Sequence, residues 1–228
     1  MATKRKVYLH VGVSGGPGDF LEAALLEHTH ALASLGVRVP VENADEMFRA
    51  AVEITRTHKA WGYKRREVEG AWAGICRRIH KLKGLDTAVL SQPLLHDATP
   101  EQIDLLVDTL AGTKVHVVLV AGPDADPDTL AELRERWGRA VKKPERVHVL
   151  EVDAADRAEV WRRFGALVGF GTASLSVAGL AQPTPTTLGE ALAVVARLAR
   201  RNETLELKLA ETERRRRRLK RRQAADAA

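Results

Sequence analysis

The stretch Val7-Tyr-Leu-His-Val-Gly-Val-Ser-Gly-Gly-Pro-Gly-Asp19 decides the fold, because an apolar run leads directly into a glycine-rich turn. Leucines then recur at helical spacing from Leu21 to Leu35, and Gly36 ends this amphipathic segment. We therefore expect a buried strand, a tight turn and a helix that Asp19 caps. A strand, turn and helix in this order are typical of an α/β domain.

Further apolar runs alternate with amphipathic segments along the chain. They predict strands at 37–41, 87–91, 114–121 and 146–152, and helices at 44–58, 66–82, 100–111, 127–141 and 156–168. Strands that are separated by helices indicate a parallel sheet. The predicted fold class is α/β, a parallel sheet of about five strands with helices on both faces. The run 114–121 is the most continuous, so we expect it at the centre.

The pattern changes near Ser174, which divides the chain into four predicted parts. Residues 1–174 form the α/β domain, 175–187 a Pro/Thr-rich loop, 188–222 a long C-terminal helix with an Arg-rich end, and 223–228 a frayed tail. The first half of the helix carries an apolar stripe. This stripe is a candidate for helix-mediated oligomerisation, although its heptads are few.

Composition narrows the class of protein. Hydrophobic residues make up 45% of the 228 residues, which is enough for a core. The single cysteine, Cys76, excludes an internal disulfide framework and a Cys-rich zinc site. No apolar run approaches the roughly 20 residues that cross a bilayer, and the first residues lack a signal-peptide pattern. We expect a cytoplasmic protein without a membrane span.

The net charge of +6 is a property of the C-terminal end. Eight basic side chains lie between residues 214 and 222, and Asp226 is the only charge after them, so residues 1–213 sum to −1. The basic residues are Arg214, Arg215, Arg216, Arg217, Arg218, Lys220, Arg221 and Arg222. Such a run is either an arm for nucleic acid or an acidic partner, or a solubilising terminus.

The glycine-rich turn has the position of a phosphate-binding loop but lacks its chemistry. A Walker A loop needs Lys and Ser or Thr after its last glycine, and here Asp19 follows Gly18. A carboxylate at a helix N-terminus occupies the place that an anion would take. The turn by itself therefore favours a structural role over nucleotide binding.

The segment from His10 to Glu22 resembles the opening of bacterial PAPS-dependent sulfotransferase-like proteins, which carry H-[IV]-G-x-x-K-T-G-T-T-x-L-Q and later G-V-x-x-P. The second pattern matches Gly36-Val-Arg-Val-Pro40. Further pieces match in order up to about residue 202: 69–72, 89–95, 99–102, 115–121, 161–164, 185–189 and 201–202. The resemblance implies a P-loop sheet that binds 3′-phosphoadenosine 5′-phosphosulfate (PAPS). Its cofactor-binding residues, if the site is still used, would be Gly12, Ser14, Gly15, Gly16, Gly18 and Ser91.

Position by position, the resemblance also implies that the loop has lost its ligands. The family's sulfuryl-contacting Lys falls on Gly15, and a glycine falls on Pro17, which has no N–H to donate. The three loop threonines fall on Gly16, Gly18 and Asp19. Each lost charge-assisted contact costs about 1.5–3 kcal/mol of binding free energy.

The two other parts of the family site are altered as well. Where a base often follows the third strand, this chain has Gln92 and Pro93, neither of which titrates near pH 7. The Arg for the 3′-phosphate falls on Gly122, and the next basic position on Asp126. We therefore assign no catalytic residue and expect no bound PAPS.

Two groups of side chains are candidate metal ligands. His10, His116 and His148 lie on predicted strands, and Asp124, Asp126 and Asp128 alternate before a predicted helix. An imidazole in an apolar strand is more often a hydrogen-bonded core or rim residue, and acidic residues are frequent at helix starts. We favour these structural roles and expect no metal site.

Aromatic and basic residues mix at Trp61, Tyr63 and Lys64-Arg-Arg66. Such a mixture can stack on a base and pair with a phosphate. A packed aromatic pair beside a solvated basic turn explains it equally well, and we favour that interpretation.

Three hypotheses of function follow. The first is a sulfotransferase-fold protein that has lost PAPS-dependent sulfuryl transfer and acts as a binding or scaffold module. The second is an active sulfotransferase that uses an atypical loop with Ser14, Ser91 and backbone N–H groups. The third is a nucleic-acid-associated protein that acts through its Arg-rich end.

Overall fold

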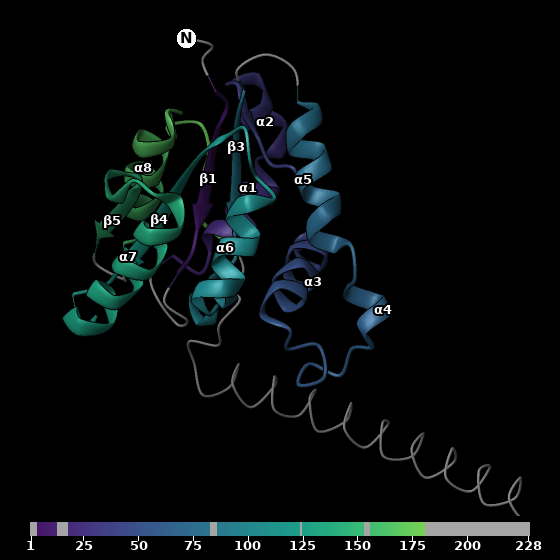
Figure 1. Cartoon of the computed structure of the whole chain (residues 1–228). Coiled ribbons are helices and arrows are strands. Elements are labelled where there is room, and N and C mark those ends of the chain that lie inside the picture. The colour runs from purple at the N-terminus through teal and green to yellow at the C-terminus, as the bar shows by residue number, and fades with distance from the viewer. Residues whose placement is uncertain (1–3, 13–17, 83–85, 124, 153–155, 181–228) are drawn as a thin grey trace, which may run out of the picture. The chain divides into compact units, whose positions relative to one another are not determined.

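The computed structural model describes residues 4–12, 18–82, 86–123, 125–152 and 156–180 (Figure 1). All of these belong to the first of two compact units, residues 1–183. The second unit, residues 184–228, lies outside the described residues, and with it the predicted helix 188–222, its basic run and its frayed tail. In the described part, no helix is long and apolar enough to cross a membrane.

Five parallel strands form one sheet with the order β2-β3-β1-β4-β5. The strands are β1 (Lys6–His10), β2 (Val37–Arg38), β3 (Thr87–Ser91), β4 (Lys114–Ala121) and β5 (Val147–Glu151). The α/β fold with about five parallel strands is confirmed. The expectation that 114–121 lies at the centre was wrong, because β1 lies there. A continuous apolar run shows that both faces of a strand are covered, which holds for β1 and β4 alike.

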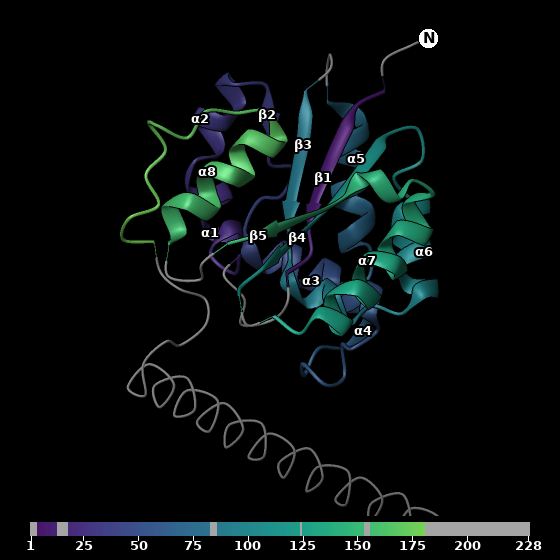
Figure 2. The same ribbon diagram turned by 90° about the vertical axis from the view of Figure 1, so that its left-hand side faces the viewer.

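Helices cover both faces of this sheet, as expected (Figure 2). One face is covered by α1 (Leu21–Glu27), α2 (Thr29–Ser34) and α8 (Arg157–Val168). The other is covered by α3 (Ala44–Thr55), α5 (Ala71–Lys81), α6 (Pro100–Asp108) and α7 (Pro127–Val141), with the short α4 (Arg65–Val68) nearby. The 3-10 turns are η1 (Pro93–Asp97) and η2 (Pro144–Arg146). Neighbouring residues of β1 serve different cores: Tyr8 packs with the α8 side and Leu9 with the α7 side.

The helix after the glycine-rich turn differs from the prediction in two ways. It is interrupted at His28, which separates α1 from α2. Its N-cap is Phe20, which makes no side-chain cap, so the predicted cap by Asp19 was wrong. The backbone closes this end instead, because the Leu21 N–H donates to the Gly18 carbonyl at 2.9 Å.

Two other predicted elements have different boundaries in the structure because of the backbone at a glycine and a proline. The predicted helix 66–82 divides into α4 and α5 at Gly70, whose φ of +87° lies in the left-handed region that favours glycine. The predicted strand 37–41 stops at Arg38. Pro40 has no N–H for a ladder, which explains why pairing does not extend through it.

The strand order places a topological switch point, the usual position of a ligand crevice in an α/β fold, at the carboxyl ends of β1 and β3. The connection after β1 runs through α1 on one face, and the connection after β3 runs through α6 on the opposite face. Neighbouring strands whose connections diverge in this way leave a ligand crevice beyond their carboxyl ends. His10 and Ser91 are the last residues of these two strands.

Candidate functional site

A buried histidine lies at this switch point. His10 is fully buried, and its Nδ1 lies 2.8 Å from Ser91 Oγ. The backbone register places the two residues side by side. Burial lowers the pKa of His10 to about 3, so the imidazole is neutral at pH 7. Its Nε2 is buried and has no hydrogen-bond partner among the residues that the structure describes.

Both described ends of the glycine-rich turn pack directly on this imidazole. A Cβ on Gly18 would lie 2.6 Å from His10 Nε2 and 3.0 Å from Val120 Cβ. A Cβ on Gly12 would lie 3.2 Å from the same Nε2. The distance at position 18 is too short for a Cβ unless the ring or the turn shifts, so the close approach of the ring favours glycine there, whereas the contact at position 12 would only be tight.

A carboxyl group and an amide complete the site. Gln92 is buried, its N–H donates to the His10 carbonyl at 3.0 Å, and its Nε2 donates to Glu22 Oε1 at 3.4 Å. Burial raises the pKa of Glu22 to about 7. The site therefore contains a group that titrates near neutral pH, in the first turn of α1.

Sequence reasoning missed Glu22. The sequence pattern points to Gln92 and Pro93, which follow the third strand, as the positions of a proton-accepting group, whereas the titrating group comes from the helix after the first strand. One signal was present: Glu22 stands where the family pattern has Gln. Its burial depends on the packing of α1 beside β3, which no local pattern reveals.

The structure brings together three of the six residues that the resemblance assigned to the cofactor. Gly12 and Gly18 contact the imidazole of His10, and Ser91 is hydrogen-bonded to it. Ser14, Gly15 and Gly16 lie outside the described residues. Ser91 is buried, and its hydroxyl is directed at the ring.

The three strand histidines do not form one cluster. His116 Nδ1 lies 3.0 Å from His148 Nε2, whereas His10 bonds Ser91. The prediction that these are hydrogen-bonded core or rim residues is confirmed.

The acidic stretch before α7 begins a helix, as expected. Asp126 is the N-cap of α7, and its Oδ2 accepts from the Thr129 N–H at 3.0 Å. Of the other two candidate ligands, Asp128 lies in the first turn of α7, and Asp124 lies outside the described residues.

In the segment from Trp61 to Arg66, the aromatic side chains are packed and the basic side chains are exposed, as the favoured interpretation predicts. Trp61 packs edge-on against Phe48 with ring centroids 5.1 Å apart, and Tyr63 contacts the same ring at 6.3 Å. Lys64, Arg65 and Arg66 are exposed.

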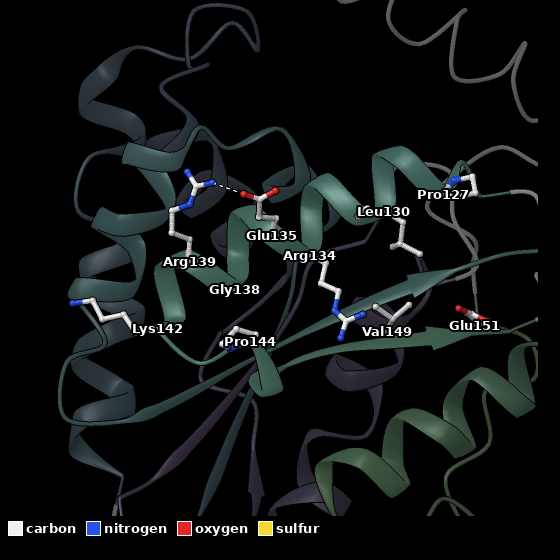
Figure 3. A pocket seen from close by; sticks show the side chains of 11 residues that line it. Pro127, Leu130, Arg134, Glu135, Gly138, Arg139, Lys142, Pro144, Val149 and Glu151 are labelled. Atoms are coloured by element: carbon white, nitrogen blue, oxygen red, sulfur yellow. Dashed lines mark hydrogen bonds and ion pairs between the residues drawn. The ribbon is translucent and has the colours of Figure 1, made fainter.

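A separate groove of about 750 Å³ runs between α7 and β5 (Figure 3). Leu130 and Val149 form its apolar floor, and the Arg134 side chain extends from α7 over Val149. Glu135 and Arg139 on its rim pair with each other at 2.7 Å. Val149 belongs to the core on the α7 side, whereas His10 faces Phe164 of α8, so the groove and the His10 site lie on opposite faces of the sheet.

Comparison with known proteins finds no family model that matches the chain and no matching curated protein.

Proposed function

We propose that this protein is a sulfotransferase-fold binding or scaffold module that has lost PAPS-dependent sulfuryl transfer. The parallel α/β sheet is compatible with the fold that the resemblance implies. One observation carries the proposal: the switch point, where the resemblance places the anion site, holds the buried, neutral imidazole of His10 and the carboxyl group of Glu22.

The electrostatics of these groups oppose a polyanion. A neutral His10 contributes no positive charge, and Glu22 adds a negative one as the pH rises through about 7. Asp19 lies at the start of α1, where the helix dipole would otherwise favour a phosphate. These features accord with the loss of Lys at position 15 and Arg at position 122.

Calorimetric titration with PAPS and with its desulfated product tests this proposal. We expect no binding at micromolar concentration, and a micromolar Kd at physiological salt would overturn it. The variant Gly15→Lys/Asp19→Thr/Gly122→Arg should gain affinity for the desulfated nucleotide. The matched control Gly74→Lys/Asp108→Thr/Ala111→Arg makes the same charge change elsewhere and should gain none. Equal affinity in both triple variants would show that positions 15, 19 and 122 do not correspond to the family's anion-binding positions.

Glu22 favours a second candidate, an active sulfotransferase with an atypical loop. A carboxyl group with a pKa of about 7 is matched to the task of a general base that removes a proton from an acceptor hydroxyl. Sulfuryl transfer from PAPS to a panel of phenols and alcohols, measured for the natural chain and for Glu22→Gln, tests this candidate. Turnover that falls at least about a hundredfold in the variant would support it. No turnover by the natural chain would exclude it for those acceptors.

A further inference from the structure

A second polar cluster lies at the opposite end of the same strands. Side chains two residues apart on a strand share a face, so Lys6 and Tyr8 of β1 lie on one face of the sheet. Lys114 and His116 of β4 pair in register with these two residues and share that face. His148 of β5 joins them through His116. Lys6 and His10 are four residues apart, about 13 Å along the strand, so this cluster is distinct from the His10 site.

Like charges face each other in this cluster. Lys6 and Lys114 are direct register partners on adjacent strands, an arrangement that destabilises a sheet. Arg146, immediately before β5, adds a third cation whose charge acts on His116. Among the described residues, none of these three side chains forms an ion pair.

Two imidazoles lie beside these cations. His116 and His148 are hydrogen-bonded at 3.0 Å, and Tyr8 stacks on His116 with ring centroids 4.7 Å apart. Burial, together with smaller effects of the charges of His148, Arg146, Lys6 and Lys114, lowers the pKa of His116 to about 4. Burial also lowers the pKa of His148. Both rings are therefore neutral at pH 7, and the cations that act on His116 at this pH are Lys6, Lys114 and Arg146.

We propose that Lys6, Lys114 and Arg146, with His116 and His148 beside them, form a binding site for a phosphate-class anion that carries at least two negative charges. Three unpaired cations supply the charge. One imidazole donates its N–H to the other, so the neutral pair has one N–H left to donate to an anion. A metal cation is the wrong ligand, because every charged group that acts on His116 is positive. Negative charge here relieves the repulsion between the two lysines.

Anion binding at this site must be coupled to proton uptake. A bound anion stabilises the imidazolium form, so it raises the pKa of His116 from its value of about 4. The coupling is reciprocal, so affinity for the anion rises as the pH falls. The Arg-rich end of the chain also attracts anions, but it does not produce this signature at His116 and His148.

Histidine-resolved NMR of the full isotope-labelled chain, titrated with inorganic pyrophosphate at constant ionic strength, tests the site. The single variants His116→Gln and His148→Gln assign the two resonances, and the exposed His30 serves as an internal reference. We expect the pKa of His116 to rise with pyrophosphate and that of His30 to stay constant. If the His116 and His148 resonances do not move at millimolar pyrophosphate, the proposal is wrong.

The lysines are tested by a matched pair of double variants. Lys6→Gln/Lys114→Gln should weaken pyrophosphate binding, read from these resonances, by at least about tenfold. The control Lys59→Gln/Lys81→Gln removes the same charge from exposed positions outside the cluster and should leave affinity within about twofold. The thermal melt of each variant establishes folding, and removal of the repelling lysines should not lower the Tm. Equal weakening in both variants would show that the effect comes from net charge alone, and the proposed site would be wrong.

Discussion

Ser91 Oγ lies 2.8 Å from His10 Nδ1, and the two residues are register partners at the carboxyl ends of neighbouring strands. The bond fixes the ring at the switch point and satisfies one of its two nitrogens. Because the imidazole is fully buried, this single bond replaces water that the ring would otherwise contact.

Replacing Ser91 with Ala should lower the free energy of unfolding by about 1–3 kcal/mol, because a buried ring nitrogen loses its partner. Chemical denaturation at neutral pH measures the change. Ser34→Ala is the matched control, since Ser34 is exposed on α2, and its effect should stay within about 0.5 kcal/mol. Equal stabilities for Ser91→Ala and the natural chain would mean that water replaces the hydroxyl.

Gly18→Ala should destabilise the fold by about 1–3 kcal/mol, because the added methyl meets the imidazole and Val120. Thermal unfolding compares this variant with Gly74→Ala. Gly74 lies inside α5 with open space around a Cβ, so alanine there should stabilise by about 0.5–1 kcal/mol. The two glycines should therefore respond with opposite signs. A neutral effect at position 18 would show that the turn shifts away from His10 at little cost.

Glu22 should make stability fall as the pH rises. Its pKa is raised to about 7 in the fold, so the protonated form is favoured. The resulting stability is fully present below the ordinary pKa of about 4.5 and is lost as the pH rises through about 7. Glu22→Gln imitates the protonated form. Between about pH 5 and pH 8 the natural chain should lose up to about 3 kcal/mol more than this variant.

Urea denaturation at both pH values measures that difference, and Glu27→Gln, an exposed change in the same helix, is the control. If the natural chain and Glu22→Gln lose the same stability over this range, the carboxyl group ionises without penalty and is hydrated.

Non-specific binding to DNA or RNA should depend on residues 214–222. If about six of their side chains engage phosphates, the logarithm of the binding constant should fall against the logarithm of salt concentration with a slope near −5 for duplex DNA. Ending the chain at Glu213 leaves a net charge of −1 and should abolish binding with little change in Tm. Ending it at Arg222 keeps the basic run and should preserve binding. Binding that survives removal of the run would place the site on the rest of the chain, first at Lys59 to Arg66.

Local sequence signals were sufficient for much of the fold. The strands 87–91 and 114–121 and the helix 127–141 occur as predicted, because sharp apolar runs and Pro127 mark their ends. The interruptions at His28 and Gly70 were missed, since the apolar spacing continues across both. Periodicity shows which residues face a core but not where the backbone breaks.

The contacts in the His10 site and in the lysine–histidine cluster could not be predicted from the sequence, because they join residues that are far apart along the chain. The pairing of His10 with Ser91 joins strands that are 81 residues apart, and the pairing of Lys6 with Lys114 depends on strand register. Strand order and register arise from packing between distant segments, so a single sequence does not specify them. The same holds for Glu22, whose pKa depends on the elements that bury it.

The two edges of the sheet differ in their risk of intermolecular association. Among the described residues, β2 and β5 each pair on one side only. The β2 edge has two residues, and Pro40 follows closely, so it offers little template for a foreign strand. The β5 edge has five residues without proline and borders the apolar groove under α7. Edge-to-edge aggregation of partly unfolded chains should therefore begin at β5 rather than at β2.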